Sequence, residues 1–239
     1  MLSGAGSALV TWHTFYEMRP LQTRRLLAED VADRIREEIL TGRVGHGERL
    51  VEVVIAEELG VSRGPVREAL KLLNGEGLVT EEPHRGAHVT QVSCADVRDI
   101  FDLRAALEAG AARQIAARHT PSDVHALHRL VERLAEAARG GDMERALQAD
   151  LAFHESVCQL TGNRRLVEVC VRNVPMVKSL MKPERLTREN LDDMARELGL
   201  VLQAIEEGDG DLAAARITAH AERARDMLIA HLDGSLQRA

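Results

Sequence analysis

The stretch Ala56–Leu70, AEELGVSRGPVREAL, decides the fold of the leading part of the chain. It predicts two short helices separated by a glycine turn, because Gly60 is suited to end the first helix and Ser62 to cap the second. Pro65 falls in the first turn of the second helix, where a missing amide hydrogen does little harm. Apolar side chains able to pack the two helices together stand at Ala56, Leu59, Val61, Val66 and Leu70. This layout predicts a helix-turn-helix.

The segments on either side extend this unit. Between Leu26 and Leu40, an amphipathic helix is predicted by apolar residues four positions apart, at Leu27, Val31, Ile35 and Ile39. After the helix pair come two short extended segments, Leu78–Glu82 and Ala87–Gln91, and the turn between them makes a hairpin of the size called a wing. We therefore expect a winged helix-turn-helix over residues 23–92, preceded by a loose arm over residues 1–22.

Nearly everything after Ser93 has the pattern of helices. Start signals for six helices stand at Ser93, Thr120-Pro121, Asp142, Asn163, Thr187 and Asp211. No internal repeat interrupts them. The sequence therefore predicts a mostly α protein, in which an N-terminal winged helix-turn-helix is followed by an all-α six-helix bundle over residues 93–235.

Composition and charge narrow the class of protein. The chain has 239 residues, enough for two domains, and a net charge of −7, so any nucleic-acid binding must come from a local basic patch. Three cysteines, Cys94, Cys158 and Cys170, have no paired short spacing, which favours a reducing cytoplasm over a disulfide framework. No apolar run approaches the ~20 residues that cross a bilayer, and no signal-peptide pattern opens the chain. We expect a cytoplasmic protein without a membrane partner.

The second helix of the helix-turn-helix carries the basic patch. Arg63, Arg67 and Lys71 are four residues apart and so share one face, which suits the major groove of DNA. Ser62 at the helix start can meet a phosphate, and Arg85 stands beside Gly86, where a bare backbone could approach the sugar-phosphate chain. The alternative for the helix is an ordinary solvated face. The combination with a wing favours DNA binding.

Four ionisable residues fall inside apolar stripes of the predicted bundle: Arg104, Asp150, His154 and His220. Buried ionisable groups are costly unless they are paired or bound to something, so their presence predicts a polar cavity. An Asp/His/His set can hold a divalent cation, and an inward arginine can bind a carboxylate with two hydrogen bonds.

Simpler interpretations of these residues stay open. An inward histidine is more often a hydrogen-bonded core residue than a metal ligand. Arg104 could pair with Glu108 one turn along its helix, and Asp150 with His154 could be a local pair. His125 and His128 lie off the apolar stripe of their helix and are expected at the surface.

The leading part resembles a known family. GVSRGPVREALKLLNGEGLV, followed by HRGAHV, is similar to the winged-helix domain of GntR regulators, a likeness that covers Leu26–Val92. The resemblance implies that DNA is contacted by Ser62, Arg63, Gly64, Arg67 and, from the wing, Gly86. Two positions depart from the family: Gly64 stands where Thr is usual, and Val53 stands where some members carry a DNA-contacting Arg.

The region Ser93–Leu232 resembles the FCD effector domain of the FadR subfamily, in its six-helix VanR-like branch. The segment Asp150–His154, DLAFH, is similar to the D-x-x-x-H metal motif of that domain, and His220 within ARITAH matches its last ligand. Arg104 within LRAALE matches an inward arginine of that domain, and the resemblance implies that Arg104 helps to bind the acid group of an effector. The third histidine ligand of the family falls at Leu198, so the implied site for zinc, manganese or nickel keeps three protein ligands.

These observations predict a transcription regulator that is not an enzyme. We expect a homodimer that binds a double-stranded operator, most simply as a repressor, and that responds to a small organic acid. One rival interpretation is a degenerate member that binds DNA constitutively. Another is a metallohydrolase that uses Asp150, His154 and His220, although no evident base or nucleophile accompanies them.

Overall fold

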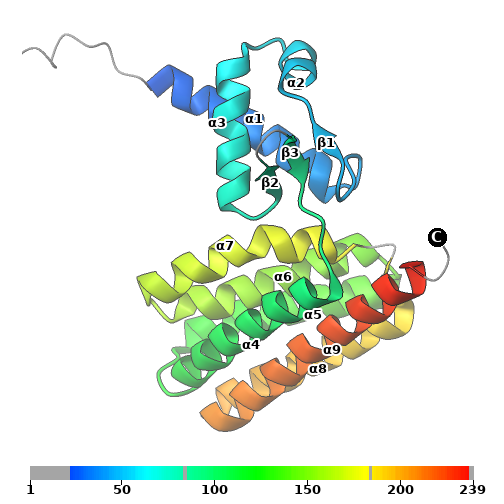
Figure 1. Ribbon diagram of the computed structural model, residues 1–239. Coiled ribbons are helices and arrows are strands. Elements are labelled where there is room, and N and C mark those ends of the chain that lie inside the picture. The colour runs from blue at the N-terminus through cyan, green and yellow to red at the C-terminus, as the bar shows by residue number, and fades with distance from the viewer. Residues whose placement is uncertain (1–21, 83–84, 183–184, 237–239) are drawn as a thin grey trace, which may run out of the picture.

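The computed structural model describes residues 22–82, 85–182 and 185–236. The arm predicted over residues 1–22 therefore lies almost entirely outside the described residues. A small module of helices and short strands sits above a larger bundle of six helices, α4 to α9, as Figure 1 shows. The mostly α fold predicted from the sequence, a winged helix-turn-helix followed by a six-helix bundle, is confirmed.

Three helices form the core of the first module: α1 (Gln22–Leu40), α2 (Glu52–Glu58) and α3 (Arg63–Gly75). Gly60 follows α2 with a φ of 64°, a conformation in which glycine avoids the strain of a side chain. Val66, Leu70 and Leu73 of α3 are fully buried against α1. Leu27, which the apolar spacing of α1 placed in the core, is exposed, because the buried stripe begins at Ala28.

The wing is part of a three-stranded antiparallel sheet of order β1-β3-β2. The strands are β1 (Arg49–Leu50), β2 (Val79–Glu82) and β3 (Gly86–Val89). The sequence predicted the two longer strands, but it gave no sign of β1, which is two residues long and exists through its pairing with β3. In the register of the hairpin Glu82 lies opposite Gly86, whose φ of 85° favours glycine at the turn.

The bundle contains the six helices that the start signals predicted. They are α4 (Cys94–Ala116), α5 (Pro121–Gly140), α6 (Met143–Leu160), α7 (Arg164–Leu180), α8 (Arg188–Glu206) and α9 (Gly210–Leu236). The predicted capping residues of the first five helices accept hydrogen bonds from backbone amides. The last start signal, Asp211, lies in the first turn of α9, while Asp209 accepts the amide of Leu212.

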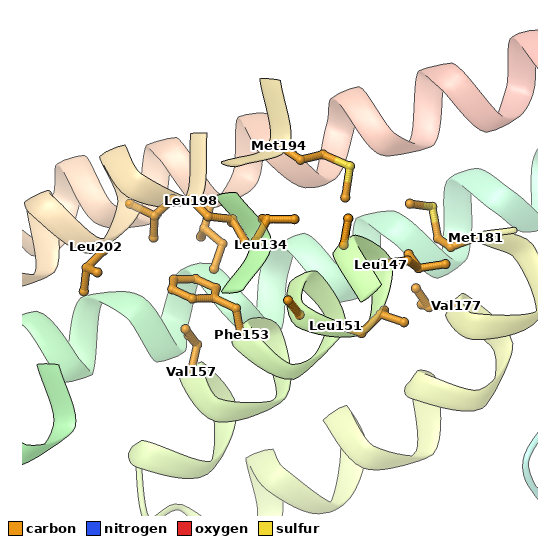
Figure 2. Close-up of a cluster of buried hydrophobic side chains, with 14 of the residues drawn as sticks. Leu134, Leu147, Leu151, Phe153, Val157, Val177, Met181, Met194, Leu198 and Leu202 are labelled. Atoms are coloured by element: carbon orange, nitrogen blue, oxygen red, sulfur yellow. The ribbon is translucent and has the colours of Figure 1, made fainter. Parts of the chain in front are cut away.

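The bundle core is built from aliphatic side chains and two phenylalanines, Phe101 and Phe153, as the low aromatic content requires. Figure 2 shows Leu198 in the same apolar cluster as Phe153 and Leu202. Leu198 does point inward, as its stripe predicted, and is completely buried. In α4, Arg104 is buried as the sequence predicted, together with Ala105, whereas Leu103 is exposed.

The winged-helix module meets the bundle over α7 (Figure 1). Lys182, just after α7, donates hydrogen bonds from Nζ to the carbonyls of Ile39 at 3.1 Å and Leu40 at 2.6 Å. A cation is favourable there, since the last carbonyls of a helix carry partial negative charge. Lys182 is only 7% exposed. A buried ammonium group thus joins the bundle to the last turn of α1.

Candidate DNA interface and candidate metal centre

The cations of α3 are exposed as the sequence predicted. The side chains of Arg63, Arg67 and Lys71 are 59%, 54% and 55% accessible. In this structure they are held by acidic neighbours rather than directed freely into solvent. Lys71 pairs with Glu68 at 3.0 Å, one turn away on the same helix.

Glu52 of α2 holds both arginines of α3. Arg67 donates from Nε and Nη2 to the two carboxylate oxygens of Glu52 at 3.2 and 3.0 Å, and Arg63 Nη2 donates at 3.1 Å. The hydrogen bond from Arg67, aided by Arg63, lowers the pKa of the Glu52 carboxyl. The carboxylate of Glu52 on α2 therefore neutralises part of the charge of the two α3 arginines that the sequence predicts to contact DNA.

The other predicted DNA residues occupy the ends of α3 and the wing. Ser62 occupies the N-cap position before α3, as predicted, but its hydroxyl makes no capping hydrogen bond to the described residues. Gly64 lies in the first turn of α3. On the wing, the Arg85 side chain is 77% exposed and pairs with Glu82, and Gly86 faces the guanidinium of Arg49 on the neighbouring strand.

Inside the bundle, Asp150, His154 and His220 come together as the stripes predicted. The three residues are almost fully buried, and one ligand atom from each lies within 4.8 Å of the others. Asp150 Oδ1 is 3.2 Å from His220 Nε2 and 3.7 Å from His154 Nε2. The two imidazole rings stack with centroids 5.0 Å apart.

A glutamate contacts the Nδ1 side of each imidazole. His154 Nδ1 is 2.6 Å from Glu108 Oε2, and His220 Nδ1 is 2.9 Å from Glu197 Oε2. In metal sites a ligating histidine usually donates its second N–H to such an acceptor, which fixes the tautomer and leaves the other nitrogen for the metal. Both Nε2 atoms accordingly face Asp150.

The charges in the cluster are strongly coupled. Burial raises the pKa of Glu108, but Arg104 and His154 outweigh this effect and bring that pKa down to about 2. Burial lowers the pKa of His220, yet the carboxylates of Asp150 and Glu197 raise it to about 9. In the absence of a cation, a proton on His220 therefore balances part of the buried negative charge.

Several polar atoms of this cluster lack a hydrogen-bond partner within the part of the chain that the structure describes. They are Asp150 Oδ1, His154 Nε2 and Arg104 Nη2. Asp150 Oδ1 lies 3.2 Å from His220 Nε2, which is its nearest charged neighbour among the contacts described above. Because unpaired buried polar atoms are costly, their convergence fits a bound cation at Asp150 and His154 and a bound anion at Arg104.

Arg104 is both paired and directed toward a cavity. Its Nε donates to Glu108 at 2.9 Å, so the local pairing that the spacing allowed does occur. Its guanidinium also lines a cavity of about 370 Å³, together with His154, Cys158, Cys170 and Asn173. A second cavity, of about 480 Å³, opens beside His220 and Arg223 on the α8–α9 side.

Comparison with known protein families decides the identity of the chain. Residues 27–89 match the family described as bacterial regulatory proteins of the gntR family, and residues 99–233 match the FCD domain. The chain belongs to the GntR family. It is a DNA-binding transcription regulator with an FCD effector domain, and its relatives are transcription regulators rather than enzymes.

Individual relatives of this GntR regulator are also transcription regulators. It is 32% identical over 204 residues to a probable D-xylose utilization operon transcriptional repressor of Paenarthrobacter nicotinovorans, which covers 83% of this chain and 87% of the relative. It is 28% identical over 196 residues to the HTH-type transcriptional repressor RspR of Escherichia coli strain K12, over 78% of this chain and 82% of the relative. The solved structure of E. coli McbR/YncC has the same fold, with a TM-score of 0.70, 24% identity and coverage of 86% of this chain and 98% of that chain.

Three acidic residues of this GntR regulator have roles in these sites that the sequence did not predict. Glu52 and Glu197 were not considered, and Glu108 was weighed only as a partner for Arg104. A signal existed for Glu108, which shares the face of α4 with Arg104 four residues earlier. Glu197 lies at the edge of the inward stripe of α8.

Over the described ranges, none of the helices is long and apolar enough to cross a membrane.

Proposed function

We propose that this GntR regulator is a homodimeric repressor whose operator binding is controlled by a divalent metal and a small organic acid in the bundle. The observation that carries the proposal is the presence of unpaired buried atoms on Asp150, His154 and Arg104, of which His154 and Arg104 line one cavity. Because its target is DNA, the protein would act in the cytoplasm. Its relatives named as repressors support that direction of regulation.

Asp150, His154 and His220 are the residues that would hold the metal. Zinc, manganese and nickel suit a donor set of one carboxylate and two imidazoles. When bound, the metal would supply a Lewis acid that attracts the carboxylate of an effector. With Leu198 at the place of a fourth protein ligand, the set leaves coordination positions for that carboxylate or for water.

The acid-binding role of Arg104 follows from its surroundings. Glu108 occupies Nε of the guanidinium, while Nη2 has no partner among the described residues. An arginine presented in this way can donate to one oxygen of a carboxylate. The cavity that Arg104 lines is where such an acid would bind.

On the DNA side, Ser62, Arg63, Gly64, Arg67 and Lys71 would read one half-site from α3, with Arg85 and Gly86 contacting the backbone from the wing. A homodimer would present two such helices to a pseudo-palindrome. The ligand must bind the DNA-compatible and DNA-incompatible arrangements unequally in order to regulate. We propose that it favours release.

The test compares a variant that lacks one proposed metal ligand with a control variant that lacks a histidine elsewhere. Zinc affinity is measured by competition with a chromophoric chelator for the wild type, His154→Ala and His128→Ala. His128 is an exposed histidine paired with Glu206, so its loss controls for the removal of one imidazole. We expect His154→Ala to weaken zinc binding at least tenfold and His128→Ala to leave it unchanged. Equal affinity in all three proteins would exclude the metal site.

The same proteins test regulation. Genomic fragments selected by the wild type supply the operator, which is then titrated with the protein in the presence of zinc and a panel of short carboxylic acids. We expect one acid to weaken operator binding by the wild type and to have less effect on His154→Ala. If neither zinc nor any acid changes operator binding, the result favours the alternative that the protein binds DNA constitutively. The observation that supports this alternative is the complete burial of Leu198 at the position of a family metal ligand.

A further inference from the structure

Two cysteines line the wall of the Arg104 cavity. Cys158 belongs to α6 and Cys170 to α7, and both side chains line this cavity. Both thiols are free, and their interaction raises the pKa of Cys158 and lowers the pKa of Cys170. Neither takes part in the Asp150, His154 and His220 cluster. The proposed DNA and metal sites therefore leave the pair unused.

The position of Cys158 links the thiols to the metal centre. Asp150, His154 and Cys158 are successive residues at four-residue intervals on α6, so they share one face of the helix. A change in the bonding of Cys158 acts one helical turn from His154. Cys170 lies on α7, the helix that also meets the winged-helix module.

We infer that Cys158 and Cys170 form a peroxide-sensitive dithiol, whose oxidation to a disulfide ties α6 to α7 at the wall of the effector cavity. The ligand class is a small hydroperoxide, for which hydrogen peroxide is the simplest member. The thiols are 2% and 8% exposed, but they border a cavity that is open to solvent and large enough for a molecule of that size.

The reaction balances without any other reagent. The Cys170 sulfur attacks one oxygen of hydrogen peroxide, the O–O bond breaks, and the departing hydroxide takes a proton to become water. The resulting sulfenic acid is attacked by the Cys158 sulfur, its S–O bond breaks, and a second water leaves. Two thiols thus lose two protons and two electrons, and the peroxide is reduced to two waters.

Cys170 is the better first nucleophile. It is the more exposed of the two sulfurs, and the hydrogen bond from the Cys158 thiol lowers the pKa of Cys170 while the same contact raises the pKa of Cys158. Thiolates rather than thiols react with peroxides. Cys158, which lines the same cavity, is then placed to resolve the sulfenic acid before further oxidation.

The experiment counts free thiols in the full-length protein. Reduced protein is treated with hydrogen peroxide, quenched, unfolded, alkylated and weighed by mass spectrometry, and its peptides are mapped. We expect three alkylated cysteines before oxidation and one, Cys94, afterwards, with a Cys158–Cys170 linked peptide and recovery of all three by dithiothreitol. This readout needs neither DNA nor effector, so it succeeds or fails separately from the proposed function.

Variants assign the chemistry. Cys94→Ser, which removes a cysteine far along the chain from the pair, should fall from two alkylated thiols to none. Cys158→Ser and Cys170→Ser should form no intramolecular link. Three alkylated cysteines in the peroxide-treated wild type, a link that includes Cys94, or a disulfide between two copies would each overturn the inference. The count in the wild type needs no variant to fold.

Discussion

At the scale of single residues, Glu52 determines how the arginines of the recognition helix are presented. Its carboxylate accepts from both Arg67 nitrogens and from Arg63, and these are the groups that would face phosphates and bases. The carboxylate thus stands where a DNA anion would act. If these arginines contact the operator as proposed, binding would exchange the Glu52 carboxylate for a DNA phosphate, and this exchange would reduce the net electrostatic gain of the complex.

The first prediction concerns this competition. Glu52→Gln keeps the shape of the side chain and removes its charge, so the arginines no longer have to leave a carboxylate. We expect operator affinity to rise about two- to fivefold at low salt, a size consistent with exposed ion pairs, and the gain to shrink as salt increases. Fluorescence anisotropy with a labelled operator at two salt concentrations measures it.

The control for this change is Glu57→Gln, an exposed residue of the same short helix. It alters the net charge of the protein by the same amount near the same DNA. A gain of equal size in both variants would mean that general charge, rather than release of Arg63 and Arg67, raises the affinity.

At the scale of elements, local signals sufficed where one short segment of sequence determines the outcome. The caps at Ser93, Thr120 and Thr187 were found because a side chain and an amide three residues apart form each of them. The short strand β1 could not be found, since its two residues become a strand only by pairing with β3, some forty residues away.

The buried site shows the same division. The inward positions of Asp150, His154 and His220 follow from helical periodicity, and so does that of Leu198. Their meeting depends on the way in which α6, α8 and α9 pack, which no single stripe contains. Glu197 escaped prediction for this reason, because its role comes from the His220 ring of another helix.

A prediction at this scale restores the missing ligand of α8. Leu198→His places an imidazole beside Glu197, at the position where family resemblance implies a metal ligand. Without metal, the buried imidazole should destabilise the fold by about 1–3 kcal/mol, because an unsatisfied polar group replaces an apolar one. Zinc should reverse that loss, and zinc affinity should exceed that of the wild type about tenfold or more.

Thermal unfolding with and without zinc measures both effects. Leu202→His is the matched control, since Leu202 is also buried, lies one turn further along α8 and belongs to the apolar cluster in Figure 2. It should lose stability without being rescued by zinc. If zinc stabilises the two variants equally, the ion does not bind at the position of Leu198.

At the scale of the whole molecule, regulation requires that the bundle and the winged helix respond to each other. The structure offers a short physical route between them. Met181 lines the cavity beside His220, and the next residue, Lys182, donates to the last carbonyls of α1. A shift of the chain at Met181 would therefore act directly on the helix that supports α3.

The last prediction tests this connection. Lys182→Met keeps much of the length of the side chain but removes the ammonium group, so the carbonyls of Ile39 and Leu40 lose a charged donor that contributes about 2 kcal/mol. We expect the last turn of α1 to exchange its amide hydrogens faster and calorimetry to show the winged-helix module unfolding before the bundle. Lys178→Met is the control, because Lys178 is a more exposed lysine of α7 whose ion pair with Glu155 stays within the bundle. If both variants unfold like the wild type, Lys182 does not couple the two modules, and the signal from the cavity must cross by other contacts of α7.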